Sequence, residues 1–170
     1  MDFLRDAEQL RQINLFAQLD DSRLKLLAFS SEEVSFEDGD VIFTMNSVSD
    51  SAYVVMSGEV SVFANLEGAG DAIASLSTND VVGEMGVIRN GPRAATLRAK
   101  GKVRCLRILA DDFMKLLKEN PGVSLAVLRQ LADRLGRTTE ALEQLRQQQD
   151  RKSTRLNSSH SQQSRMPSSA

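Results

Sequence analysis

The sequence has too few metal-binding and nucleophilic side chains to build most kinds of catalytic site. Its 170 residues contain one cysteine, Cys105, one histidine, His160, and no tryptophan. Because one cysteine and one histidine cannot form a cluster of soft metal ligands, iron–sulfur and haem sites are excluded. The sequence also contains no Ser/His/Asp or Cys/His constellation. We therefore predict that the protein is not an enzyme and binds no metal.

Long apolar runs are missing as well. No stretch approaches the ~20 apolar residues that a membrane-spanning helix needs. The first ten residues, MDFLRDAEQL, lack the basic start and the apolar core of a signal peptide. A lone cysteine permits no internal disulfide, which suits a reducing compartment. These absences predict a cytoplasmic protein with no membrane partner.

The residues that are present predict an α+β fold. Hydrophobic residues make up 41% of the chain, which is long enough for one domain with a real core. Apolar residues recur at helical spacing in residues 1–30. From residue 32 the period changes to two, in short β-branched runs separated by turn residues. Asp38-Gly39 and Ser57-Gly58 are predicted to be hairpin turns of a compact antiparallel β-structure.

Residues 83–96, with the sequence GEMGVIRNGPRAAT, have the composition of an anion site. The glycines loosen the backbone, and residues 84–88 can form a short helical turn whose first N–H groups are free to donate to a phosphate. Arg93 supplies a permanent positive charge and can form two parallel hydrogen bonds. Single elements of this pattern are common in ordinary turns, but their order and spacing together favour an anion-binding segment.

This segment resembles, without a gap, the phosphate-binding cassette of cyclic nucleotide-binding domains, as in cAMP-dependent protein kinase regulatory subunits and Crp/Fnr-type regulators. The resemblance implies a β-roll at residues 31–110, which is jelly-roll-like and is also described as a double-stranded β-helix. N-terminal helices at residues 1–30 would precede the roll. Lid and dimerisation helices at residues 111–150, the second of them long, would follow it. The implied ligand is a cyclic nucleotide.

The resemblance also implies roles for single residues of the cassette. Glu84 would accept the ribose 2′-hydroxyl, Arg93 would pair with the cyclic phosphate, and the N–H groups of Gly86 and Ala94 would help to hold that phosphate. In relatives tuned to cGMP a threonine often follows the arginine, so Ala94 favours cAMP over cGMP. Two residues depart from the family pattern: Gly86 stands where alanine is common, and Arg89 where an apolar or aromatic residue is usual. The candidate ligand-binding residues of the cassette are Gly83, Glu84, Met85, Gly86, Arg93, Ala94 and Ala95.

A helix with a heptad seam is predicted from Pro121 to Asp150. Leucines recur along it at alternating spacings of three and four, with a break at one threonine, at Leu128, Leu131, Leu135, Leu142 and Leu145. Such a seam needs a partner helix, and we predict a parallel homodimer. A helix folded back on its own domain would explain only the first half of the seam.

Thr138 and Thr139 are candidate contacts to the base. Their segment, RLGRTTEAL, resembles the part of the dimer helix in the catabolite activator protein where adjacent hydroxyls reach the adenine ring, one from each subunit. The alternative is that these threonines only set the register of the helix.

Residues 151–170 differ in composition from the rest of the chain. They are rich in serine and contain no acidic residue. Because they offer too little apolar surface to fold, they are predicted to be disordered. Two origins stay open: a natural tail, or an artefactual, out-of-frame translation appended to a broken reading frame.

The sequence thus predicts a sensor that binds a cyclic nucleotide, cAMP in preference to cGMP, and couples binding to movement of the C-terminal helix. The chain could act on a separate, unidentified effector protein. Alternatively, it could be the sensor part of a truncated Crp/Fnr-type transcription regulator that lacks its helix-turn-helix domain. No specific DNA binding is expected of the chain itself. Two other hypotheses are less favoured: a segment of a channel or kinase, and a cassette that has lost its ligand and serves only in dimerisation.

Overall fold

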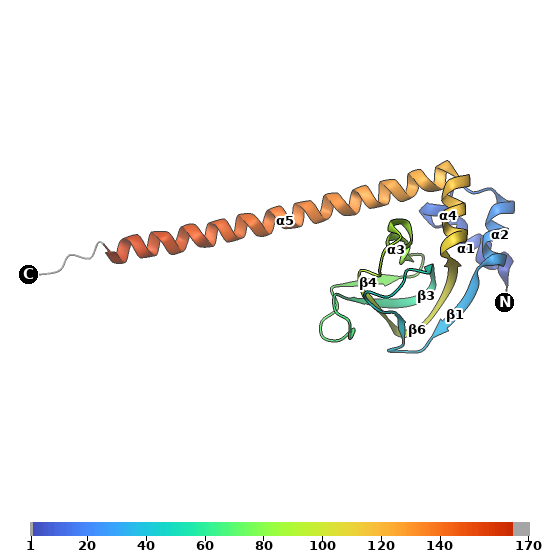
Figure 1. The fold of residues 1–170 in the computed structure, drawn as a ribbon, viewed down its shortest axis with the longest axis horizontal. Helices are drawn as coiled ribbons and strands as arrows, with labels where there is room; N and C mark the ends of the chain where they lie inside the picture. Colours follow the sequence, from blue (N-terminus) through green and yellow to red (C-terminus); the bar gives the residue numbers. More distant parts are fainter. Residues whose placement is uncertain (1, 165–170) are drawn as a thin grey trace, which may run out of the picture. The chain divides into compact units, whose positions relative to one another are not determined.

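The computed structural model describes residues 2–164, with side chains for residues 2–156. The chain divides into two compact units, one ending at Ala126 and the other beginning at Val127. The first unit contains an antiparallel sheet of six strands. Helices precede this sheet, and a long helix ends the described chain (Figure 1). The predicted α+β class, with N-terminal helices and a long C-terminal helix, is confirmed.

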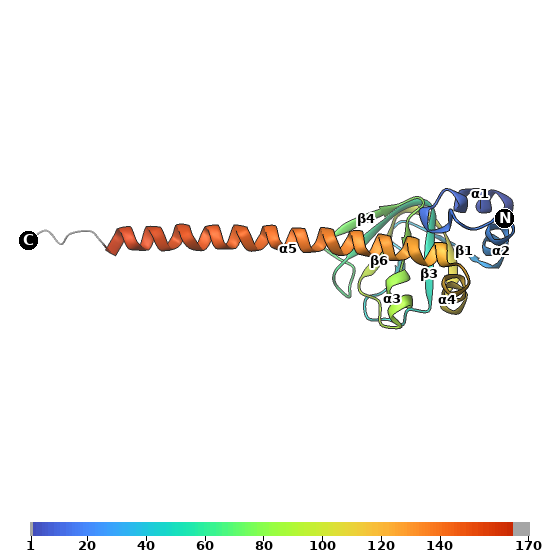
Figure 2. The same cartoon turned by 90° about the horizontal axis from the view of Figure 1, so that it is seen from above.

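The N-terminal segment forms two α-helices with a short 3₁₀ helix between them. Their bounds are α1 Phe3–Arg11, η1 Asn14–Phe16 and α2 Asp21–Ser30. An aspartate caps each α-helix. The carboxylate of Asp2 accepts from the N–H of Arg5 (3.2 Å), and that of Asp20 accepts from the N–H of Arg23 (2.8 Å). The helices that the spacing in residues 1–30 predicted are therefore present, and α1 and α2 lie side by side (Figure 2).

All strand pairs in the sheet are antiparallel. The strands are β1 Glu32–Phe36, β2 Val41–Phe43, β3 Ser51–Phe63, β4 Ala74–Ser77, β5 Val81–Val82 and β6 Thr96–Leu109. β6 pairs with β1, β2 and β3, whereas β3 pairs also with β4 and β5. The two longest strands therefore hold the sheet together, and every other strand pairs with one of them.

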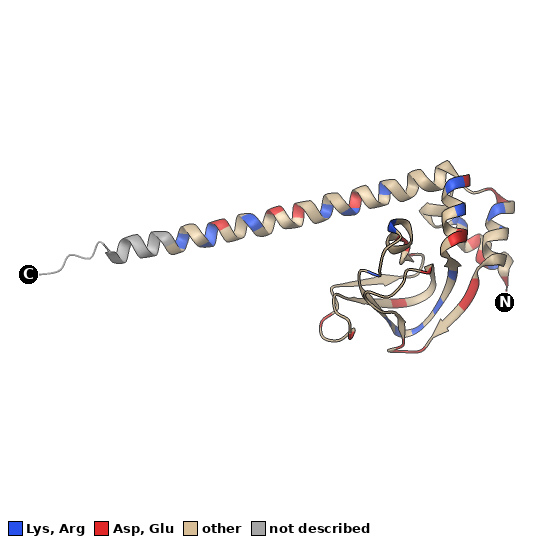
Figure 3. Cartoon of the chain, in the orientation of Figure 1, with Lys and Arg blue, Asp and Glu red and all other residues tan. Residues whose placement is uncertain are grey.

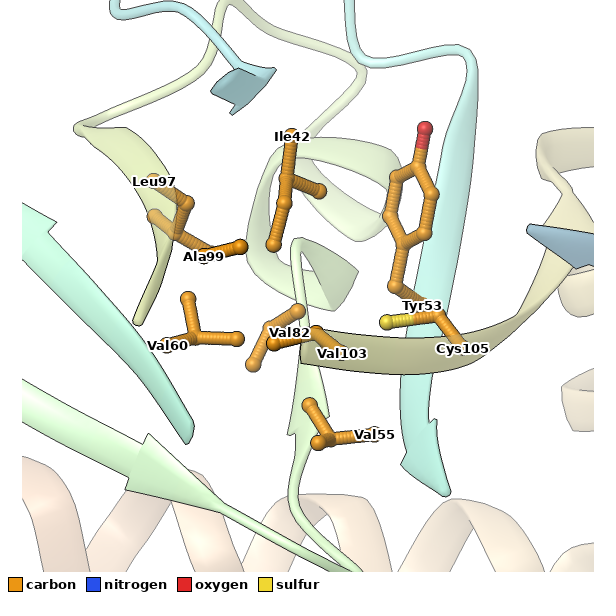
Figure 4. Packing of buried hydrophobic residues seen from close by; sticks show 9 residues of the cluster. All are labelled: Ile42, Tyr53, Val55, Val60, Val82, Leu97, Ala99, Val103 and Cys105. Carbon is orange, nitrogen blue, oxygen red and sulfur yellow. The ribbon is translucent and has the colours of Figure 1, made fainter. Parts of the chain in front are cut away.

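The core of the roll lies between these strands. Figure 4 shows nine of its buried side chains, which come from β2, β3, β5 and β6: Ile42, Tyr53, Val55, Val60, Val82, Leu97, Ala99, Val103 and Cys105. Burial raises the pKa of the Cys105 thiol to about 12. Since the thiolate is the reactive form of cysteine, Cys105 is an inert core residue.

Two predicted hairpin turns differ in the structure. Ser57-Gly58 lies inside β3, which is one strand with register shifts around Ser57 where it faces β6. Gly58 has a φ of +103°. A glycine with positive φ can form a bulge as readily as a turn, and here it lies at a bulge. Asp38-Gly39 does turn the chain, but the strands on either side, β1 and β2, both pair with β6 and not with each other.

An ion pair fixes the N-terminal helices to the roll. Asp6 of α1 is 2% exposed and accepts a hydrogen bond from Nη2 of Arg104 in β6 at 3.0 Å. Glu33 of β1 accepts from Nη1 of the same arginine at 3.2 Å. The hydrogen bond to Asp6 raises the pKa of Arg104, although burial opposes this. A buried carboxylate is tolerated when it is paired, so α1 has one defined position on the sheet.

Two helices follow the roll, α4 Ala110–Glu119 and α5 Pro121–Ser164. α5 begins at the predicted proline but continues past Asp150, where the sequence predicted its end and the start of a disordered tail. No glycine or proline occurs between residues 137 and 166. A formed helix adds each further residue at little cost, which accounts for the extension. Residues 165–170 lie outside the described residues.

Basic and acidic residues are interspersed along much of the described part of α5 (Figure 3). Within residues 2–164, no helix combines the length and the hydropathy that a membrane crossing requires.

Candidate anion-binding site

The predicted anion segment folds as a short helix between two left-handed residues. α3 spans Glu84–Arg89, with Gly83 before it at a φ of +78° and Asn90 after it at a φ of +52°. The N–H of Asn90 donates to the carbonyl oxygen of Val87 (3.1 Å), and the N–H of Gly91 donates to that of Gly86 (3.0 Å). The helical turn that the sequence predicts is therefore present, and it is closed by backbone hydrogen bonds at its end.

Arg93 lies beside this turn with 2% of its surface exposed. Its Nη1 donates to the carbonyl oxygen of Gly83 (3.0 Å), and its Nη2 donates to that of Ser51 (2.7 Å). The guanidinium carbon lies 4.1 Å from the centroid of the Phe43 ring, which is a cation–π arrangement. The Nε atom is buried and has no hydrogen-bond partner among the residues that the structure describes. The guanidinium is thus held in one orientation, with its Nε–H unpaired among the described residues.

Glycine is favoured at position 83 by the backbone conformation and by the closeness of the Arg93 side chain. Its φ of +78° is a conformation that other residues adopt only with strain. A Cβ atom there would lie 2.5 Å from Nη1 of Arg93 and 3.1 Å from Cε2 of Phe43. A side chain at residue 83 would push the guanidinium out of its place, so this glycine allows Arg93 to reach the turn.

The protein neutralises Arg93 only in part. Burial lowers the pKa of Arg93 below its ordinary value, but an arginine stays protonated near neutral pH. Its carboxylate partner, Asp50, is 3.4 Å from Nη2 and 59% exposed. The same carboxylate is 3.0 Å from Arg107. Because Asp50 is shared with Arg107 and faces solvent, it neutralises the charge of Arg93 only in part.

The groups around Asp50 also shift the pKa of its carboxyl group. Burial by itself would raise the pKa of this carboxyl group. The hydrogen bond from the Ser51 hydroxyl and the charges of Arg107 and Arg93 lower it, and the net effect is a pKa below the ordinary 3.8. Asp50 is therefore ionised at neutral pH and acts as an acceptor only.

The remaining predicted cassette residues lie around the same turn. Glu84 is 3% exposed, whereas Ala94 is exposed. The others are half-buried: Met85, Gly86 and Ala95. The hydrogen bond between Gly83 and Arg93 brings the two ends of the cassette together, although they are ten residues apart in sequence.

Thr138 and Thr139 belong to the other unit of the chain. Both are exposed on α5. Their hydroxyls donate to the carbonyl oxygens of Arg134 and Leu135, each at 2.9 Å. Such bonds within one helix are usual for threonine, and contact with a base stays a prediction.

The sequence patterns did not identify three residues that lie at the site. Phe43, Asp50 and Ser51 lie 50, 43 and 42 residues before Arg93, and each of them contacts its guanidinium. Phe43 ends β2, Ser51 begins β3, and Asp50 lies directly before it. The loop before β3 pairs with residues 92 and 93, which brings these residues to Arg93. No local spacing signals such a contact, because it depends on how the strands pair.

The comparisons with known proteins agree with this arrangement. The family model described as the cyclic nucleotide-binding domain matches residues 33–120, which include the whole sheet after Glu32, the cassette and α4. The chain belongs to the cyclic nucleotide-binding domain family. Its predicted β-roll, similar to that of its structural neighbours, is thereby confirmed.

Two relatives and one solved structure illustrate the breadth of this family. The chain is 29% identical over 109 residues to a cAMP-dependent protein kinase regulatory subunit of Blastocladiella emersonii, covering 64% of this chain and 27% of that protein. It is 26% identical over 139 residues to the CRP-like cAMP-activated global transcriptional regulator of Mycobacterium tuberculosis, covering 81% of this chain and 62% of that protein. The N-terminal domain of a transcriptional regulator from Streptomyces coelicolor A3(2) matches with a TM-score of 0.60 and 34% identity, covering 78% of this chain and 96% of that domain. The chain thus spans only part of both full-length relatives.

Proposed function

We propose that the chain is a cAMP sensor in which the cassette binds the cyclic phosphate. The observation that carries this proposal is the buried, oriented Arg93 with its unpartnered Nε. A cyclic nucleotide is a monoanion whose phosphate offers only acceptors, so it fits a fixed, positively charged donor. Two relatives whose names specify cAMP, one a kinase regulatory subunit and one a transcriptional regulator, support the choice of nucleotide.

The other ligand contacts follow from the family pattern. Glu84 accepts the ribose 2′-hydroxyl, and the N–H groups of Gly86 and Ala94 bind the phosphate beside Arg93. Glu84 is buried next to Gly83, where a carboxylate is a strong acceptor for a hydroxyl. Thr138 and Thr139 contact the base, in a form of the protein in which their helix covers the site.

Binding changes the position of the helices that follow the roll. α4 packs against α3 as well as against β3 and β6. A movement of the cassette turn is therefore passed directly to α4 and from there to α5, which begins two residues after α4 ends. The ligand acts by favouring one of two pre-existing arrangements of these helices.

Nucleotide preference is the first test. We expect calorimetric titration of the purified protein to give tighter binding of cAMP than of cGMP. The matched variant is Ala94→Thr, which adds a hydroxyl at an exposed position of the cassette and should narrow the preference by improving cGMP binding. If the protein binds neither nucleotide, the proposed function is wrong; if it prefers cGMP, the choice of cAMP is wrong.

We also propose that the output helix works as a parallel homodimer. Four leucines of the heptad seam are 56–68% exposed in the single chain, namely Leu128, Leu135, Leu142 and Leu145. Exposed leucines at heptad spacing are stabilised by packing against a second copy of the same seam.

Sedimentation of the wild type and two variants tests this dimer. We expect the wild type to be a dimer and Leu142→Lys to be a monomer, because a charged side chain in the seam cannot pack against its partner. Gln144→Lys introduces the same charge on the opposite face of the helix and should remain a dimer. A wild-type protein that is monomeric at all concentrations would contradict the proposal.

A second candidate output is that of a Crp/Fnr-type transcription regulator of which the chain is the sensor part. The observation that favours it is the match to nearly the whole N-terminal domain of a transcriptional regulator. In this case the movement of α5 would serve a DNA-binding domain, whereas a free-standing sensor would act on a separate effector protein.

A further inference from the structure

The hydroxyl of Ser49 is a buried polar group without a partner. Its Oγ atom is closed off from solvent and forms no hydrogen bond within the described residues. Leaving a buried hydroxyl unpaired costs free energy, and such groups in native structures commonly have a functional explanation. A second orphan of the same kind is Nε of Arg93.

The loop that carries Ser49 is fixed to the cassette on both sides of this residue. Val48 forms an isolated antiparallel bridge with Pro92. Asp50 contacts Nη2 of Arg93 at 3.4 Å. Since its two neighbours are attached to residues 92 and 93, the backbone of Ser49 has little freedom to move away from the site.

The side chain of Ser49 lies directly against α3. A Cβ atom on Gly86 would overlap Oγ of Ser49 and would lie 2.9 Å from its Cβ. The hydroxyl therefore occupies space that any larger residue at position 86 would fill. In the same way, the guanidinium of Arg93 lies against Gly83. The Ser49 hydroxyl and the Arg93 guanidinium thus lie against Gly86 and Gly83, which are three residues apart in the cassette.

We infer that Ser49 donates a hydrogen bond to the phosphate of the bound nucleotide, beside Arg93. This inference rests on the proposed function. A phosphate offers several acceptors, and a hydroxyl that donates to an anion makes a charge-assisted hydrogen bond. Both orphan atoms are shielded from solvent, so the phosphate reaches them when the cassette turn moves. Satisfying two buried donors then favours the moved form over the ligand-free form.

The substitution Ser49→Ala separates this role from a purely structural one, because it removes only the hydroxyl oxygen. Without ligand, the variant should melt at the same temperature as the wild type or higher, since an unsatisfied polar atom is gone. With cAMP, calorimetry should show binding weakened by about tenfold, the effect of one hydrogen bond to a charged group. The substitution should therefore weaken cAMP binding without lowering the melting temperature of the ligand-free protein.

Ser47→Ala is the matched control in the same loop. The Ser47 hydroxyl is exposed and already donates to the carbonyl oxygen of Thr44 (2.5 Å), so its loss should leave cAMP affinity unchanged. If Ser49→Ala binds cAMP as tightly as the wild type, or if it lowers the melting temperature without ligand, the role of Ser49 is wrong while the proposed function stands. If the wild type itself fails to bind cAMP, the proposed function fails first.

Discussion

The substitution Arg93→Ala is expected to weaken cAMP binding by ~2 to 5 kcal/mol, because it leaves a buried phosphate without its counter-charge. This corresponds to roughly thirtyfold to several thousandfold in the dissociation constant. Titration calorimetry of the wild type and the variant measures the effect. The expected loss is large because Arg93 is 2% exposed, so water cannot replace the missing cation.

Two further variants make this result specific. Arg93→Lys keeps the positive charge but loses the planar fork that reaches the carbonyl oxygens of Gly83 and Ser51, so it should rescue only part of the affinity. Arg89→Ala removes an exposed arginine from the neighbouring helix α3 and should bind as the wild type does. Melting curves must show that each variant is folded. Nearly unchanged binding by a folded Arg93→Ala would remove the basis of the proposed site.

The cassette could be predicted from the sequence because its information is local. Glycine, glutamate and arginine stand within 11 residues, between Gly83 and Arg93, and the turn between them closes on itself through short-range hydrogen bonds. The environment of Arg93 could not be predicted in the same way. Phe43 and Asp50 reach it only after β2, β3 and β6 have paired, and sequence spacing does not encode that pairing.

The sequence also could not show that β3 is one continuous strand. Ser57-Gly58 looks like a hairpin turn because serine and glycine are turn residues between two β-branched runs. The partner strand decides otherwise, since β6 runs along both halves of β3 and Gly58 takes up the bulge between them. Local turn chemistry therefore predicted an irregularity at the right place but could not distinguish a bulge from a reversal of the chain.

Phe113 is the fully buried residue of α4, the helix that follows the roll. α4 packs on β3 and β6 and also on α3. We therefore expect a loss of packing at Phe113 to affect both the stability of the protein and the proposed transmission of ligand binding. Phe29 of α2 has the same side chain but is 70% exposed, with its ring 5.7 Å from that of Phe3, which makes it a matched control.

The substitution Phe113→Ala should lower the free energy of unfolding by about 3 to 5 kcal/mol, the usual cost of emptying a buried phenylalanine site. Phe29→Ala should cost less than about 1.5 kcal/mol, the contribution of one aromatic pair. Urea denaturation of both variants measures the difference. Because a total stability of 5 to 15 kcal/mol is typical, Phe113→Ala would bring the protein close to unfolding.

cAMP at about 100 times its dissociation constant should restore roughly 2.7 kcal/mol of this loss if α4 is in its native place when the ligand is bound. Equal costs for the two substitutions would show that α4 does not pack on the roll in solution, and the proposed path from the cassette to α5 would then be wrong.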